Sequence, residues 1–174
     1  MTLWRISNHA TLDGAGGLRA AGRWHTRGAR IVYCAQNPAS ALLEILVHAE
    51  IAIEDIPVAF RWLEIDAPDS VAVETVDPGI LGPAWRSQPA ATRRLGDHWL
   101  AASRSALLRV PSAIVPETWN VLINPLHPGA ARIRVARKWG GPPGLPRRQA
   151  TLRPAGQARR PAPPHAQTVD RRLV

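Results

Sequence analysis

A change of composition near Gly140 most constrains what this chain can fold into. Residues 140–174 hold 7 of the 17 prolines, many arginines and almost no large apolar side chains. Such a segment cannot bury enough apolar surface to offset the conformational entropy that ordering removes. We therefore expect one folded body over residues 1–136 and an Arg/Pro-rich, disordered tail over residues 137–174.

The distribution of charge follows the same division. The whole chain carries a formal net charge of +9, which by itself would favour a nucleic-acid partner. However, residues 132–174 hold 11 of the 22 basic residues and one of the 13 acidic residues. Residues 1–131 hold the other 11 basic and 12 acidic residues, so the body is close to neutral.

Cysteine content and hydropathy predict the compartment. Cys34 is the single cysteine, so no intramolecular disulfide can form, which fits a reducing environment. The N-terminal residues turn polar too early for a signal peptide, and no apolar run is long enough for a membrane span. The sequence predicts a cytoplasmic protein without a membrane partner.

The pattern of apolar residues and turn formers predicts an α+β body. Asn37 and Pro38 have the residue types of a helix N-cap and first turn, which predicts a helix start there. Strands are expected at residues 4–6, 30–35, 57–66, 71–76, 105–110, 120–124 and 132–136, helices at 39–49 and 90–103, and a flexible loop at 13–17.

Glu44 is the first candidate for chemistry, because it is the only charged residue between Ala41 and Val47. A buried carboxylate is costly unless it is paired or hydrogen-bonded. One interpretation places Glu44 on a narrow exposed stripe with Ala41 and His48. The other holds it at the edge of a cleft with an unusual pKa.

Arg23 and Tyr33 are further candidates. Arg23 follows Gly22, so its guanidinium could approach a phosphate closely and bind it through two hydrogen bonds; alternatively it is a surface arginine beside an inward-packing Trp24. Tyr33 lies in the middle of an expected strand. It could pack in a half-buried core or stack on a flat ring.

The remaining reactive residue types give weaker signals. Ser112 lacks a Gly-x-Ser-x-Gly elbow and fits a turn serine. Cys34 fits a small buried apolar residue better than a nucleophile. The six histidines show no metal-ligand spacing with cysteine, so no metal is expected.

The order of these segments resembles the RES domain, a family of bacterial toxins. The resemblance extends over residues 4–134. It rests on Gly22-Arg-Trp-His25, Ile31-Val-Tyr33, Ala41-Leu-Leu-Glu-Ile-Leu-Val-His48, Leu95-Gly-Asp-His-Trp-Leu100, Arg104-Ser-Ala-Leu-Leu-Arg-Val-Pro-Ser112, Val115-Pro116 and Asn120-Val-Leu-Ile-Asn-Pro-Leu-His-Pro128.

The resemblance implies a fold like that of ADP-ribosyltransferases, a split β-core with flanking helices around an NAD⁺ cleft. It implies cleavage of the nicotinamide–ribose bond, with NAD⁺ as substrate and no cofactor. By motif position, the catalytic set would be Arg23, Tyr33 and Glu44. Contacts to NAD⁺ would come from Arg5, Trp24 and Ser112.

The resemblance also implies a partner. Toxins of this family are neutralised by an antitoxin, typically with a helix-turn-helix domain and a segment that plugs the cleft, so any DNA contact would be indirect. The sequence leaves open whether the chain forms a homodimer. It also leaves open whether water, phosphate or a protein side chain accepts the ADP-ribosyl group.

Two departures from the family pattern stand out. His25 occupies a position where the family usually has Asn. After Ile133 the family continues with a further strand containing Asp-Pro-Arg-Leu, which residues 135–174 lack. A reading-frame change in GC-rich DNA would produce such a tail and would weaken the closing strand of the fold.

Two other functions remain as alternatives. The chain could bind nucleic acid through its basic tail, which predicts strongly salt-dependent binding that disappears when residues 140–174 are removed. It could instead be an inactive RES-like remnant with an altered C-terminus, which predicts insolubility or no cleavage of NAD⁺.

Overall fold

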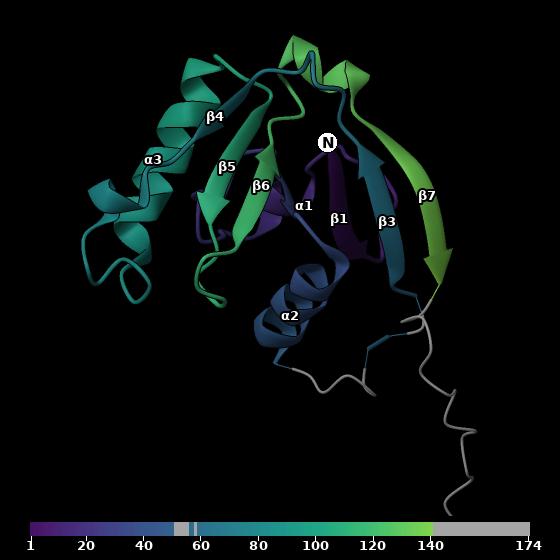
Figure 1. Ribbon diagram of the computed structural model, residues 1–174, viewed down its shortest axis with the longest axis horizontal. Helices are drawn as coiled ribbons and strands as arrows, with labels where there is room; N and C mark the ends of the chain where they lie inside the picture. Colours follow the sequence, from purple (N-terminus) through teal and green to yellow (C-terminus); the bar gives the residue numbers. More distant parts are fainter. Residues whose placement is uncertain (51–55, 58, 141–174) are drawn as a thin grey trace, which may run out of the picture. The chain divides into compact units, whose positions relative to one another are not determined.

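The computed structural model describes residues 1–50, 56, 57 and 59–140. These residues form one mixed sheet with helices around it (Figure 1). The sheet has seven strands in the order β4-β5-β6-β2-β1-β3-β7. The strands are β1 (Thr2–Ser7), β2 (Val32–Ala35), β3 (Arg61–Asp66), β4 (Val73–Thr75), β5 (Leu107–Pro111), β6 (Trp119–Ile123) and β7 (Arg134–Gly140).

The α+β architecture and most of the expected elements are confirmed. The helices are α1 (Gly16–Arg19), α2 (Pro38–Ala49) and α3 (Pro89–Ala102). Two 3₁₀ turns, η2 (Pro78–Leu81) and η3 (Pro128–Arg132), were not anticipated, and neither was α1, which lies partly in the expected loop at 13–17. Among the described residues, no helix is long and apolar enough to cross a membrane.

The helix that carries Glu44 begins where the sequence predicts. Asn37 is extended, and its side-chain oxygen accepts a hydrogen bond from the Ser40 amide at 2.8 Å. The Pro38 ring suits the first turn, where its missing N–H would have no helical partner. This start fixes the rotation of α2, whose apolar residues pack against Trp4 and Ile6 of β1. Figure 1 shows α2 below β1.

The sheet opens between β1 and β2. Antiparallel pairing joins β1 to β3 over six residue pairs, but it joins β1 to β2 at a single register position, Trp4 opposite Ala35. The Arg5 guanidinium bridges the strands where they diverge, because its Nη1 donates to the Tyr33 carbonyl at 3.0 Å. This divergence produces the split β-core.

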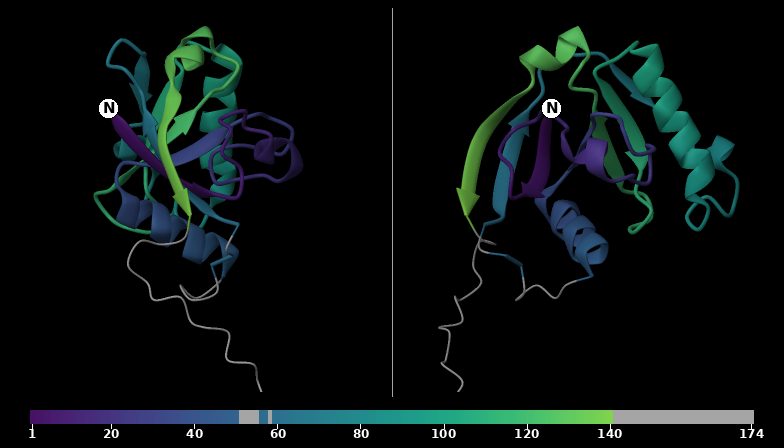
Figure 2. Two further views of the ribbon diagram at one scale, coloured as in Figure 1. Left: turned by 90° about the vertical axis from the view of Figure 1, so that its right-hand side faces the viewer. Right: turned by 180° about the vertical axis from the view of Figure 1, so that it is seen from behind.

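Helix α3 covers the other half of the sheet and holds the loop between α1 and β2. The views in Figure 2 show α3 alongside β5. Trp99 packs with Leu108 and Val110 in the core. The Thr92 hydroxyl donates to the Arg23 carbonyl at 2.7 Å. Gly96 allows this close approach, since a Cβ there would lie 1.7 Å from the Trp24 carbonyl oxygen.

The last strand differs from expectation. The body was expected to end at Ala136, yet β7 continues to Gly140 and pairs with β3 along its length. The Trp139 ring stacks on that of Trp62, with centroids 6.4 Å apart and planes inclined by 4°. A closing strand is therefore present without an Asp-Pro-Arg-Leu sequence. The rest of the expected tail, residues 141–174, lies outside the described residues.

The packing of α3 gives a first prediction. Gly96→Ala should destabilise the protein by about 1–3 kcal/mol, the usual range for overpacking, because the new methyl group meets backbone that cannot rotate away. Urea denaturation followed by circular dichroism measures the change. Gly16→Ala is the matched control: a Cβ there would meet nothing within 4 Å. Equal stabilities of the two variants would contradict the packing.

Candidate functional site

A cavity of about 440 Å³ lies where β1 and β2 diverge. Its walls come from β1, α1, the loop between α1 and β2, β2 itself, α2 and β6. The lining residues are Trp4, Arg5, Ile6, Gly16, Gly17, Ala20, Ala21, Gly22, Arg23, His25, Ile31, Tyr33, Cys34, Ala35, Ala41, Glu44, Ile45, His48 and Asn120.

Glu44 faces this cavity from α2. Ala41, Glu44 and His48 form the helical stripe anticipated from the sequence, and all three line the cavity. The stripe therefore faces the cleft and not open solvent, since Ala41 is buried. The Glu44 side chain is 22% exposed.

Three side chains hold the Glu44 carboxylate. Asn120 Nδ2 donates to its Oε1 at 2.6 Å, and the Ser112 hydroxyl donates to the same oxygen at 3.2 Å. His48 Nε2 lies 3.2 Å from the other oxygen, Oε2. Burial raises the pKa of Glu44, but the bonds from His48, Asn120 and Ser112 outweigh it, so that the net pKa is lowered. Glu44 is therefore an anion at neutral pH.

Arg23 enters the cavity from the loop between α1 and β2. Its Nη1 makes a long hydrogen bond of 3.4 Å to the Trp85 carbonyl, and no ion pair found among the described residues includes it. Its backbone is held by Thr92, and Arg93 Nε donates to the Gly22 carbonyl at 2.8 Å. The guanidinium therefore has donors to spare for an anionic ligand.

Tyr33 points from β2 into the same cavity. Its hydroxyl accepts a hydrogen bond from the Trp24 amide at 3.1 Å and lies 2.8 Å from His25 Nδ1. Burial raises the pKa of Tyr33, so the hydroxyl stays protonated. The ring is thus held at its outer end while it lines the cavity.

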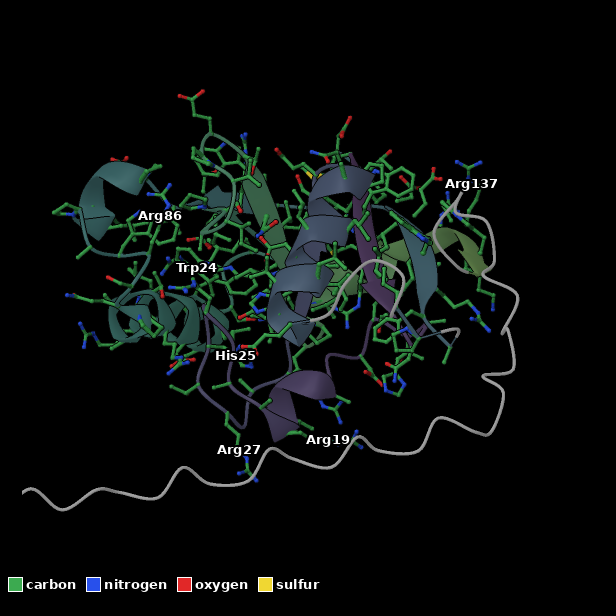
Figure 3. All side chains as sticks on the ribbon, turned by 90° about the horizontal axis from the view of Figure 1, so that it is seen from below. Arg19, Trp24, His25, Arg27, Arg86 and Arg137 are labelled. Carbon is green, nitrogen blue, oxygen red and sulfur yellow. The ribbon has the colours of Figure 1, made fainter. Side chains whose placement is uncertain are left out.

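The structure brings Arg5, Arg23, Tyr33 and Glu44 together, but it places two other predicted residues differently. Trp24 is not a lining residue; its side chain is 2% exposed and packs in the core with Trp85. Ser112 lies behind Glu44, to which it donates. Its hydroxyl also accepts from two backbone amides of its own turn, as expected for a turn serine. Figure 3 labels Trp24 together with its neighbour His25.

Sequence reasoning missed three residues of the site. Asn120 was noted only as part of a motif, and its contact with Glu44 joins positions 76 apart in the chain. His48 was assigned only to the stripe. His25 was noted only as a departure from the family, yet it is 3% exposed and hydrogen-bonded at both ring nitrogens. The i,i+4 spacing of Glu44 and His48 was the one usable signal.

Cys34 contributes no reactive group to the cavity. It is buried, and burial raises the pKa of its thiol to about 12. Within the described part of the chain, no group of three His, Cys, Asp or Glu side chains is arranged to hold a metal ion. The cavity offers two guanidiniums, one carboxylate, two imidazoles and one phenol ring, which suits a ligand with an anionic part, a flat ring and a centre that becomes cationic.

The chain resembles known proteins over most of its length. Residues 2–143 match the RES domain family. The chain is 48% identical over 135 residues to Toxin Res of Pseudomonas putida, an alignment that covers 78% of this chain and 92% of that protein. It is 41% identical over 150 residues to the Prs ADP-ribosylating toxin of Sphingobium sp., covering 79% and 92%.

A solved structure has a similar fold. The toxin–antitoxin complex MbcT–MbcA of M. tuberculosis contains a chain that superimposes with a TM-score of 0.65. The match covers 80% of this chain and 82% of that chain at 18% sequence identity. At this identity the likeness concerns the fold.

The Glu44–His48 pair gives a pH prediction. The hydrogen bond that His48 donates to Glu44 raises the pKa of His48 above its ordinary 6.5, so its stabilising effect is full below pH 6.5 and is lost as pH rises through the folded-state pKa. The pKa of Glu44 is lowered from 4.5, so its effect is full above pH 4.5 and is lost as pH falls through the folded-state pKa.

Wild type should therefore exceed His48→Gln in stability most clearly between pH 4.5 and 6.5. Urea denaturation at a series of pH values measures the difference. His9→Gln, which changes an exposed histidine away from the cavity, is the control. A difference that grows above pH 7 would contradict the pairing.

Proposed function

This chain belongs to the RES domain family, and from that premise we propose that it is the toxin of a toxin–antitoxin system that breaks the nicotinamide–ribose bond of NAD⁺. The observation that carries the proposal is the anionic Glu44 carboxylate in one cavity with Arg5, Arg23 and Tyr33. NAD⁺ is the substrate, and the reaction needs no resident cofactor.

The chemistry of this bond matches the charges of the cavity. When the bond breaks, nicotinamide leaves as a neutral molecule with the bonding electrons, and the ribose becomes oxocarbenium-like, as in glycoside hydrolysis. A carboxylate already fixed and ionised stabilises that positive charge without reorganising. The hydrogen bonds from Asn120 and Ser112 supply this fixation for Glu44.

The remaining side chains contact the other parts of NAD⁺. Arg23 binds the diphosphate, because its guanidinium has no carboxylate partner in the part of the chain that the structure describes. Tyr33 stacks on the nicotinamide ring. Arg5 lines the wall at the strand divergence. The cavity volume of about 440 Å³ falls in the range of small-molecule sites.

The acceptor of the ADP-ribosyl group defines the final product. Water gives free ADP-ribose, phosphate gives a phosphorylated ADP-ribose, and a protein side chain gives a modified protein. The relative named Prs ADP-ribosylating toxin favours the protein acceptor as the first to test. Mass spectrometry of the products distinguishes the three.

We further propose that an antitoxin protein neutralises the toxin and that the toxin acts in the cytoplasm. The similar fold in a toxin–antitoxin complex supports an antitoxin partner, for which we propose a helix-turn-helix protein that carries any DNA contact. The toxin acts in the cytoplasm on the NAD⁺ pool. The nucleic-acid alternative depends on residues 141–174, which lie outside the described residues.

The decisive experiment replaces the carboxylate by its neutral isostere. Glu44→Gln should lower the rate of NAD⁺ cleavage by about 10²-fold or more, because the charge that stabilises the cationic ribose is lost. Nicotinamide release from purified protein measures the rate, and circular dichroism verifies the fold of each variant.

Glu50→Gln is the matched control for this experiment. Glu50 is exposed at the C-cap of the same helix and does not line the cavity, so its loss should leave cleavage unchanged. Full activity of a folded Glu44→Gln protein would refute the assigned role. A folded wild type that releases no nicotinamide, with or without candidate acceptor proteins, would favour the inactive remnant.

A further inference from the structure

The His25 side chain is hydrogen-bonded at both ring nitrogens and lines the cavity. It lies in the loop between α1 and β2 and is 3% exposed. Its Nδ1 accepts from the Gly22 amide at 3.1 Å and lies 2.8 Å from the Tyr33 hydroxyl. Its Nε2 lies 3.1 Å from the Ala20 carbonyl oxygen.

These partners determine where the proton of His25 resides. A backbone carbonyl can only accept, so Nε2 carries the hydrogen. A backbone amide can only donate, so Nδ1 has none and also accepts from the Tyr33 hydroxyl. The Tyr33 oxygen in turn accepts from the Trp24 amide at 3.1 Å. The network is complete only with a neutral imidazole.

Glycines lie close to the ring on two sides. A Cβ at Gly22 would lie 2.4 Å from the Tyr33 hydroxyl and 2.9 Å from His25 Nδ1. A Cβ at Gly17 would lie 2.9 Å from His25 Nε2. All three distances are below the separations that real side chains tolerate, so only glycine fits on either side of the imidazole.

The network holds the backbone on both sides of Arg23. The amide before it, that of Gly22, is bound to His25, and the amide after it, that of Trp24, is bound to Tyr33. We propose that neutral His25 is a positioning residue, which through Nδ1 orients the Tyr33 ring and the backbone that carries Arg23, and which releases both when Nδ1 is protonated. We call this hydrogen-bond network around neutral His25 the lock. Its consequence for catalysis rests on the proposed function, whereas the lock itself does not.

Protonation would disrupt this network for a simple reason. A protonated Nδ1 can accept neither from the Tyr33 hydroxyl nor from the Gly22 amide, so the hydroxyl loses its acceptor and the amide keeps only the His25 carbonyl oxygen, 3.1 Å away. The charged groups that act on the ring come from α3: Asp97 favours its protonation and Arg93 disfavours it. Burial is the largest influence and lowers the pKa of His25, so the lock is closed at neutral pH.

The chain has a single tyrosine, which provides a direct readout of the lock. In protein labelled with tyrosine carrying ¹³C at Cζ, the one resonance should shift as the pH falls through the pKa of His25, while circular dichroism stays native. His25→Asn should show no such step, because its amide oxygen accepts from the same donors but does not titrate. His48→Gln is the control and should keep the step.

Kinetics test the positioning role. His25→Ala should raise the KM for NAD⁺ about tenfold with a smaller change in kcat, as expected when a buried hydrogen bond that positions binding groups is lost. His25→Asn should restore the KM to within about threefold of wild type. If His25→Ala does not fold, Tyr33→Phe, which removes only the hydroxyl, should raise the KM in the same way.

The outcomes separate this inference from the proposed function. An acid-induced shift that persists in His25→Asn, or no shift in folded wild type, overturns the lock. An Asn variant as impaired in KM as the Ala variant overturns the positioning role. Absence of NAD⁺ cleavage in every protein refutes the proposed function, and the tyrosine resonance then decides the lock by itself.

Discussion

The site depends on one constraint, the compensation of the Glu44 charge. A carboxylate that is mostly withdrawn from water is tolerable only when hydrogen bonds replace its hydration. Here the donors come from three places: the next turn of α2, the turn that follows β5 and the start of β6. Because Asn120 pairs with Ala35 across β2 and β6, this donor reaches Glu44 only when the sheet is assembled in its native order. Formation of the anion site and formation of the sheet are therefore coupled.

The divergence of β1 and β2 provides the space that this anion needs. A fully paired β1–β2 ladder would close the sheet under α2, whereas pairing at one register position leaves room for side chains and a ligand. Arg5 satisfies the Tyr33 carbonyl that the missing ladder leaves free. The same arginine thus stabilises the opening and supplies positive charge to it. Loss of Arg5 would expose an unsatisfied carbonyl as well as remove a cation.

Local signals made part of this arrangement predictable. Asn37 and Pro38 predicted the start of α2, and one carboxylate within an apolar helix singled out Glu44. The resemblance placed Arg23 and Tyr33 in the same cleft. The roles of Asn120 and His25 could not be read from the sequence, because each depends on a partner that only folding brings near. Trp24 shows the same limit: its position beside Arg23 suggested the cleft, but α3 covers it and makes it core.

The protonation states of the site follow from two pKa shifts with different causes, one at Glu44 and one at His25. Hydrogen-bond donors lower the pKa of Glu44 despite its burial, which keeps the carboxylate charged. Burial lowers the pKa of His25, which keeps the imidazole neutral. Both pKa shifts move the titration of these groups away from neutral pH. At neutral pH Glu44 therefore stays charged and the lock at His25 stays closed. His48 differs, because it is 63% exposed and its pKa is raised from 6.5. The pH sensitivity of the cavity near neutrality therefore resides at its solvent-facing edge, where His48 can lose its proton while Asn120 and Ser112 still hold Glu44.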